Sequence, residues 1–211
     1  MDRRTLTAVI CVPLFLLLLI LGGWWFAVPV LLLTAVACWE YSRLLTAIRP
    51  QRRLTWILIG AAYIVLGFLS LLGLRLAFAS FLVALWLLLD IWLTDTAAYL
   101  CGRRFGRRPL APTISPHKTQ EGALAGLIAG GLIAAVFFSI AFHVNFFLAL
   151  LLSLLISVIG QIGDLLESKV KRMAGVKDSG NVFPGHGGVL DRFDSIMLAA
   201  PFAYIFALLA L

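Results

Sequence analysis

Apolar residues in this chain gather in seven long runs separated by short polar stretches. The runs cover residues 6–22, 25–46, 54–73, 76–100, 122–141, 144–165 and 193–211. A helix rises about 1.5 Å per residue, so about 20 apolar residues are enough to cross a hydrocarbon core of roughly 30 Å. The pattern therefore predicts an all-α, polytopic integral membrane helical bundle with about seven transmembrane helices.

The composition fits a membrane protein better than a soluble one. Hydrophobic residues make up 62% of the chain and charged residues 13%, whereas a soluble domain carries about 25% charged residues. The polar stretches between the runs are too short to form a separate soluble domain. We therefore expect a single membrane domain over residues 1–211, with N-terminal spans in 1–75 and the candidate site in the half formed by 76–211.

Basic residues are distributed unequally between the two sides of the predicted bundle. With the N-terminus inside, sixteen of the seventeen Lys and Arg residues fall on one side, and only Arg75 falls on the other. The positive-inside rule makes the basic side cytoplasmic, so we expect a multi-pass protein of the cell inner (cytoplasmic) membrane with a cytoplasmic N-terminus. The net charge of +7 is then explained by basic residues at the membrane surface that bind anionic headgroups. This placement argues against nucleic acid as a partner.

The first run raises a separate question, because it follows the basic start MDRR as a secretory signal would. The residues before the second run lack a small-x-small cleavage site, which favours a retained first span over a cleaved signal peptide.

Polar residues recur on one helix face where the sixth run ends. In SVIGQIGDLLESKVKR they are Gln161, Asp164, Ser168, Lys171 and Arg172, with Glu167 beside them. A carboxylate at membrane depth costs roughly 2.5–3.5 kcal/mol, so it should face a wet cavity and have a partner. A Glu167–Lys171 surface pair at i,i+4 accounts for Glu167. Asp164 still needs a counter-charge, for which a divalent metal is one candidate.

A dense polar segment, SKVKRMAGVKDSGNVFPGHGGVLDRFDS, covers residues 168–195. Its centre, VFPGHGGV, has no apolar periodicity and predicts a loop. The glycine N–H groups of such a loop can bind phosphate oxygens, and basic side chains close by would add charge. The glycines are Gly185, Gly187 and Gly188, and the basic residues are Arg172, Lys177 and Arg192. His186 is a general base, a donor to phosphate or a turn residue, and we favour the contact with phosphate.

Two aspartates follow this loop at the start of the last run. Asp191 and Asp194 lie one turn apart, which a helix N-cap with an acidic first turn would also explain. Asp191 and Asp164, however, supply hard oxygen ligands from two different spans. Such a pair suits Mg²⁺, which takes one or two carboxylates together with substrate phosphates.

A second polar stretch lies between the fourth and fifth runs. Asp95 ends the fourth run, and ISPHKTQEG precedes the fifth. We expect a helix to start at Ser115–Pro116, with Lys118 and Glu121 just inside it, because proline in the first turn suits a helix N-terminus that faces anions. A capped helix beside a basic juxtamembrane loop explains the same residues equally well.

Glycine occurs at every fourth position where the fifth run opens. Gly122, Gly126 and Gly130 put a flat stripe on one helix face, so that another backbone can come close. The stripe predicts either tight packing within one chain or a dimer interface, and packing within the chain is the simpler explanation.

At the residues of the polar segment the chain resembles the phosphatidate cytidylyltransferase family, the CDP-diacylglycerol synthases. The family signature reads S-x-hydrophobic-K-R-x4-K-D-x-small-x2-hydrophobic-P/G-x-H-G-G-hydrophobic-x-D-R-hydrophobic-D. Its places are filled here by Ser168, Lys171, Arg172, Lys177, Asp178, Gly180, Phe183, Pro184, His186, Gly187, Gly188, Asp191, Arg192 and Asp194. The resemblance extends to DTAAY at 95–99 and to Ser115, Lys118 and Glu121, and so covers roughly the C-terminal 120 residues.

The resemblance implies an all-helical membrane enzyme that joins CTP to phosphatidate, giving CDP-diacylglycerol and pyrophosphate. It also implies Mg²⁺ held by Asp164 and Asp191, with room for a second cation, and a homodimer. The residues alone had led only to a phosphate and metal site on the inner face.

A mechanism follows as a hypothesis. The phosphate of phosphatidate attacks the α-phosphorus of CTP; its second pKa is about 6, so no general base is required. Cations then have to overcome the repulsion between two polyanions. We expect Lys171, Arg172, Lys177 and Arg192 to clamp phosphates, His186, Gly187 and Gly188 to donate hydrogen bonds, and Asp178 and Asp194 to orient the cations. Ser168, Asp95, Ser115, Lys118 and Glu121 would complete the substrate-binding rim.

Three other functions compete with this interpretation. A transporter also keeps charged residues within its spans, but its site belongs near the midplane between repeats, and no repeat is visible here. A CDP-alcohol phosphotransferase would carry a D-G-x2-A-R pattern, which this sequence lacks. A cytidylyltransferase acting on another phosphorylated lipid, such as a prenyl phosphate, is the alternative that the sequence excludes least well.

Overall fold

The computed structural model describes residues 3–78, 80–183, 185 and 187–211. Over this part the chain forms seven helices and two short strands. In order they are α1 (Arg3–Leu21), α2 (Gly23–Ile48), α3 (Arg53–Leu76), α4 (Leu82–Phe105), β1 (Pro109–Ala111), β2 (Ser115–Thr119), α5 (Gln120–Phe142), α6 (Phe146–Met173) and α7 (Leu190–Ala210). The predicted helical membrane bundle is confirmed. Among the described residues, six helices are long and apolar enough to cross a membrane, while α1 contributes a shorter apolar stretch, Val9–Leu21.

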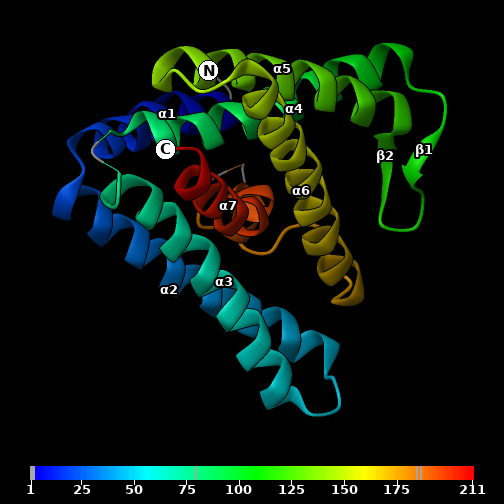
Figure 1. Ribbon diagram of the computed structural model, residues 1–211. Helices are drawn as coiled ribbons and strands as arrows, with labels where there is room; N and C mark the ends of the chain where they lie inside the picture. Colours follow the sequence, from blue (N-terminus) through cyan, green and yellow to red (C-terminus); the bar gives the residue numbers. More distant parts are fainter. Residues whose placement is uncertain (1–2, 79, 184, 186) are drawn as a thin grey trace.

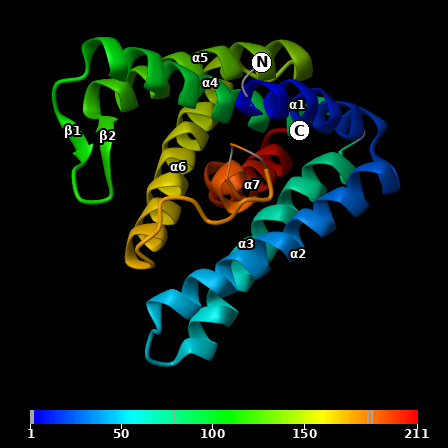
Figure 2. The same ribbon diagram turned by 180° about the vertical axis from the view of Figure 1, so that it is seen from behind.

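Helix α7 lies at the centre of the bundle. In Figures 1 and 2 it sits between α6 on one side and the pair α2 and α3 on the other, and it contacts α3, α4 and α6. The α2–α3 turn, the β1–β2 hairpin and the end of α6 point to the same side of the molecule (Figure 1). The polar stretches that join these elements therefore lie on the same side of the bundle (Figure 1).

Helices α4 and α5 are packed with their backbones almost touching. A Cβ atom at Gly122 would lie 2.6 Å from the carbonyl oxygen of Ala98, and one at Gly126 would lie 2.5 Å from that of Thr94. Any larger residue would push the two helices apart. The glycine stripe is therefore used for packing within the chain, as the simpler of the two explanations predicted.

The segment before α5 corrects the sequence-based expectation. Ser115 and Lys118 lie in strand β2, which pairs antiparallel with β1 through Pro109 with Thr119 and Ala111 with Ser115. The helix begins only at Gln120, after Thr119, whose hydroxyl accepts a hydrogen bond from the Gly122 N–H at 3.1 Å. The proline signal was misleading because proline also suits an edge strand, where its missing N–H is not needed for pairing.

Arg75, the basic residue on the opposite side of the predicted bundle, holds α1 to α3. Its guanidinium donates to the carbonyl oxygens of Leu19 at 2.6 Å and Ile20 at 3.1 Å. These carbonyls belong to the last turn of α1, where intrahelical donors are missing. Gly22 follows with a φ of 64°, which lets the chain turn directly into α2.

Candidate active site

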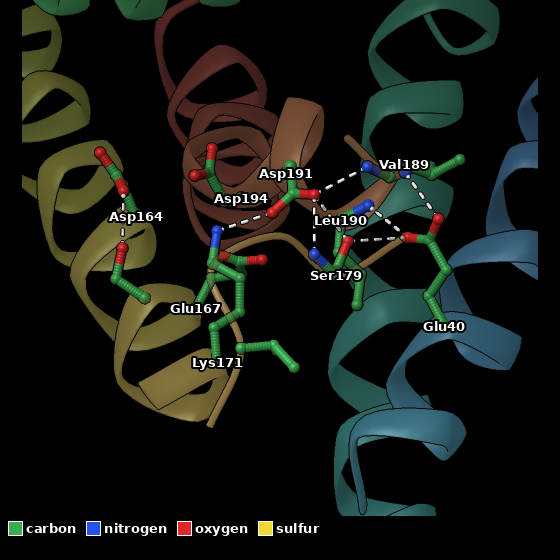
Figure 3. A network of polar contacts seen from close by, with 12 residues as sticks. Glu40, Asp164, Glu167, Lys171, Ser179, Val189, Leu190, Asp191 and Asp194 are labelled. Carbon is green, nitrogen blue, oxygen red and sulfur yellow. Dashed lines mark hydrogen bonds and ion pairs between the residues drawn. The ribbon is translucent and has the colours of Figure 1, made fainter. Parts of the chain in front are cut away.

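Asp191, in the first turn of α7, is held by donors from three directions (Figure 3). Its Oδ1 accepts from the Lys171 ammonium at 2.7 Å. Its Oδ2 accepts from the backbone N–H of Ser179 at 2.8 Å and from that of Gly188 at 2.7 Å. Because both oxygens have fixed partners, the buried carboxylate has one defined orientation.

Glycines of the predicted loop contact the Asp191 carboxylate. Gly187 has a φ of 86°, and a Cβ atom there would lie 2.5 Å from Asp191 Oδ2, so only glycine fits. The Gly188 N–H, which we expected to bind phosphate, is already donated to Asp191. Pro184 and His186, part of the same prediction, lie outside the described residues.

Lys171 joins α6 to α7 through two carboxylates. It lies 2.5 Å from Glu167 on its own helix and 2.7 Å from Asp191. The i,i+4 pair expected from the sequence is present, but it is not on the surface, because the side chains of Lys171 and Glu167 are 12% and 8% exposed. Because this ion pair is shielded from water, the loss of either partner should strongly lower the stability of the protein.

Asp164, one turn before Ser168 on α6, is paired with Lys118 from strand β2. The Ser168 hydroxyl is 3.4 Å from its Oδ1. The counter-charge that the sequence required is thus supplied in this structure by a lysine brought in by the hairpin. Burial lowers the pKa of Lys118 below its usual value, while the carboxylates of Asp194 and Asp95 act in the opposite direction.

Two cavities meet at this site. One, of about 640 Å³, is lined by apolar residues of α1, α2 and α4 and by four carboxylates, namely Asp95, Asp164, Asp191 and Asp194. The other, of about 620 Å³, is lined by polar residues of α4 and the hairpin, including Arg103, Ser115, His117 and Lys118, and it shares Asp95 and Asp164 with the first. Asp164 and Asp191 therefore border a common space, and that they share a metal ion stays a prediction.

The remaining predicted residues are spread more widely. Arg192 is exposed and lines the apolar cavity. Arg172 donates to the backbone carbonyls of Ile114 and Val176, both at 3.1 Å, and points toward the hairpin. Lys177 and Asp178 are exposed, and among the described residues neither lines the two cavities. Their contacts with substrate stay a prediction.

Glu121 has a structural partner in the hairpin. Its Oε2 accepts from the N–H groups of Arg107 at 3.0 Å and Arg108 at 3.2 Å. The side chain ties the start of α5 to the entry of β1, and so holds the strand pair that carries Lys118. A direct contact of Glu121 with substrate stays a prediction.

One residue of this site was missed from the sequence. Glu40, on α2, is fully buried, and its carboxylate accepts hydrogen bonds from Ser179, Val189 and Leu190 (Figure 3). A signal was present, because a glutamate inside an apolar run is costly unless it has partners. It was overlooked because the N-terminal spans carried no motif.

Comparison with known proteins matches the chain to the sequence model of the Cytidylyltransferase family over residues 2–70 and 46–210. The chain belongs to this family. A phosphatidate cytidylyltransferase of Staphylococcus haemolyticus (strain JCSC1435) is 35% identical over 251 aligned positions, which cover 95% of this chain and 96% of that protein. The phosphatidate cytidylyltransferase of Staphylococcus saprophyticus is 39% identical over 150 positions, covering 68% of this chain and 55% of the relative.

Family membership extends over both parts of the site. The segment with Asp95, Lys118, Asp164 and Asp191 lies within the second matched range, and Glu40 lies within the first. The resemblance seen in the polar segment is therefore confirmed, and it includes the N-terminal helices that had shown only generic hydrophobicity. The protein is a multi-pass membrane enzyme of the cytidylyltransferase family.

Proposed function

We propose that this protein transfers the cytidylyl group of CTP to phosphatidate, giving CDP-diacylglycerol and pyrophosphate. The observation that carries the proposal is the meeting of an apolar and a polar cavity at a shared carboxylate border, Asp95 and Asp164. Such a border suits a reaction between a lipid and a water-soluble nucleotide. The phosphatidate cytidylyltransferases similar to this chain support the same assignment.

The two cavities differ in the substrate that each can hold. The larger one is walled by side chains such as Phe15, Leu18, Leu33 and Trp92, which favour acyl chains. The other brings Arg103 and Lys118 next to backbone and hydroxyl groups, which suits a triphosphate. We assign the first to phosphatidate and the second to CTP.

The reaction needs one bond to form and one to break. A phosphate oxygen of phosphatidate bonds to the α-phosphorus of CTP, and the bond from that phosphorus to the oxygen bridging to the β-phosphate breaks, so that pyrophosphate leaves with the electron pair. The attacking phosphate is largely deprotonated at neutral pH, because its second pKa is about 6. Lys118 and Arg192, which line the cavities, would place positive charge close to the phosphates and reduce their repulsion. Lys171 lines neither cavity among the described residues and would act through Asp191, to which it donates.

Carboxylates that line the apolar cavity have the chemistry that Mg²⁺ requires. Among the described residues, no three His, Cys, Asp or Glu side chains are placed to hold a metal by themselves. Mg²⁺ commonly takes one or two carboxylates and completes its shell with phosphates and water, and Asp164 and Asp191 line one cavity. We propose that these two residues hold Mg²⁺ with the nucleotide, with space for a second cation; the ion would stabilise negative charge on the phosphate oxygens.

We further propose that the protein is a homodimer of the cell inner membrane with its site facing the cytoplasm. The unequal distribution of basic residues supports this orientation. Light scattering of the detergent-solubilised protein tests the dimer. Labelling of single-cysteine variants in sealed vesicles tests the orientation.

The decisive assay uses purified protein, labelled CTP, Mg²⁺ and phosphatidate in mixed micelles. We expect a labelled CDP-lipid and an equal amount of pyrophosphate. A product formed from a prenyl phosphate but not from phosphatidate would assign the activity to another phosphorylated lipid. Transport of labelled substrate into vesicles without chemical change would refute the proposal and favour a transporter.

A further inference from the structure

We propose that Glu40 is a positioning residue of the active site, which caps helix α7 from helix α2 and thereby fixes the orientation of Asp191. The inference rests on the proposed function, because it assumes that Asp191 acts on the substrates or their metal. Glu40 itself is fully buried and, among the described residues, is not part of either cavity lining. Any effect on the reaction would therefore pass through other residues.

The contacts of Glu40 are those of a helix cap supplied from a distant part of the chain. Its Oε1 accepts from the Val189 N–H at 3.1 Å, and its Oε2 accepts from the Leu190 N–H at 3.0 Å. These N–H groups belong to the start of α7, where intrahelical acceptors are missing and the helix dipole favours a negative charge. Val189 stands at the N-cap position, and valine has no side-chain acceptor. Glu40 supplies the acceptor about 150 residues away in sequence.

The same carboxylate is connected to Asp191 through Ser179. The Ser179 hydroxyl lies 3.1 Å from Glu40 Oε2 and 3.0 Å from Asp191 Oδ2. A hydroxyl has one proton, so it donates to one carboxylate at a time and links their positions. Adjacent N–H groups are also divided between the two acids, that of Gly188 going to Asp191 and that of Val189 to Glu40.

Close packing leaves this arrangement little freedom to adjust. A Cβ atom at Gly180 or Gly188 would collide with the Glu40 carboxylate, so both positions are restricted to glycine. The two ends of this loop, at residues 179–180 and 188–190, therefore pack closely around the carboxylate of Glu40. A change in Glu40 should displace the loop, and with it the Ser179 and Gly188 N–H groups that orient Asp191.

The test compares Glu40→Gln and Glu40→Asp with a matched cap variant, Asn145→Ala. Asn145 caps α6 by accepting from the Phe147 N–H at 2.9 Å, and it belongs to the α5–α6 turn, which is not among the polar loops around the site. Glutamine keeps the shape of Glu40 but turns an NH₂ group toward N–H donors. Aspartate keeps the charge on a shorter side chain. Thermal unfolding of all three variants measures the structural contribution of each cap.

For Glu40→Gln we expect kcat to fall about 10–100-fold, as is usual when a partner of a metal-binding carboxylate is lost. The KM for CTP should change less than about threefold, because the nucleotide cavity is not altered. The Mg²⁺ concentration that protects the substrate-free protein from heat should rise. Glu40→Asp should recover part of the loss in kcat. Asn145→Ala should lower Tm without changing kcat or the response to Mg²⁺.

Amide hydrogen exchange separates this inference from the proposed function. In Glu40→Gln, residues 179–190 should exchange faster than in the wild type, whatever the substrate is. If the wild-type protein forms no CDP-lipid, the proposed function fails while the exchange result still decides whether Glu40 holds the loop. If Glu40→Gln lowers Tm but keeps wild-type kcat and Mg²⁺ response, Glu40 is only a helix cap and the inference is wrong.

A second variant covers the case in which Glu40→Gln does not fold. Ser179→Ala removes the bridging hydroxyl but leaves both carboxylates and the backbone N–H in place. We expect a smaller fall in kcat and faster exchange in the same loop. Wild-type kcat together with wild-type exchange in this variant would overturn the proposed link between Glu40 and Asp191.

Discussion

Replacement of Lys171 by methionine tests the buried charge network most directly. The lysine lies between two carboxylates, at 2.5 Å from Glu167 and 2.7 Å from Asp191, and the side chains of these two acids are 8% and 3% exposed. At an effective dielectric constant of about 20, unit charges 2.7 Å apart attract each other by about 6 kcal/mol. Desolvation offsets much of this attraction while the pair is intact.

Lys171→Met keeps most of the length of the side chain but leaves two buried carboxylates without their cation. Removing one partner of a buried ion pair costs about 3–5 kcal/mol, so we expect the free energy of unfolding to fall by about that amount. The measurement is a denaturant titration of the purified protein in mixed micelles. Lys169→Met, an exposed lysine on the same helix, is the matched control and should change stability by less than about 0.5 kcal/mol.

A double variant identifies the source of the loss. Adding Glu167→Gln to Lys171→Met removes one of the two unpaired charges, and it should restore at least about 1 kcal/mol. If Lys171→Met is as stable as Lys169→Met, the three side chains do not form a charged network. The account of how α6 is joined to α7 would then have to be abandoned.

Three further outcomes follow from the packing and the site. Gly126→Leu should lower stability by about 1–3 kcal/mol or more, seen in thermal melts, because α4 leaves no space for a side chain. Ser153→Ala should cost about 1–3 kcal/mol in the same assay, since the buried Trp86 indole N–H loses its acceptor at 2.9 Å. Asp164→Asn should keep the fold, lose the ion pair with Lys118 and reduce CDP-lipid formation about 10–100-fold. Chelation of Mg²⁺ should abolish product formation by the wild-type protein.

The class of fold followed from the sequence alone. Apolar runs of about 20 residues are long enough to cross a bilayer as helices, which satisfy their own backbone polar groups. Most of each predicted run lies in an observed helix, although the run 76–100 begins in the last residue of α3 and crosses the turn before α4. The glycines at 122, 126 and 130 likewise predicted a close helix contact, since their spacing determines which face they share. The polar segment 168–195 showed where the candidate site is, because charged residues beside membrane spans need a reason to be there.

The hairpin before α5 could not be predicted from the local sequence. Ser115–Pro116 is compatible with a helix start and with an edge strand, and pairing with β1 decided between them. That choice places Lys118 against Asp164, an ion pair between residues 46 positions apart. Local sequence carries no information on such a contact.

Tertiary structure alone assigned the partners of the buried acids. The sequence determined that Asp164 needed a counter-charge, since an isolated carboxylate is costly in an apolar environment, and it predicted the pair of Glu167 with Lys171. It did not determine which cation would meet Asp164, or which N–H groups would meet Asp191. Glu40 shows most clearly what local sequence cannot predict. This acid within an apolar run caps a helix about 150 residues away, because α2 and α7 are brought together only when the whole bundle packs.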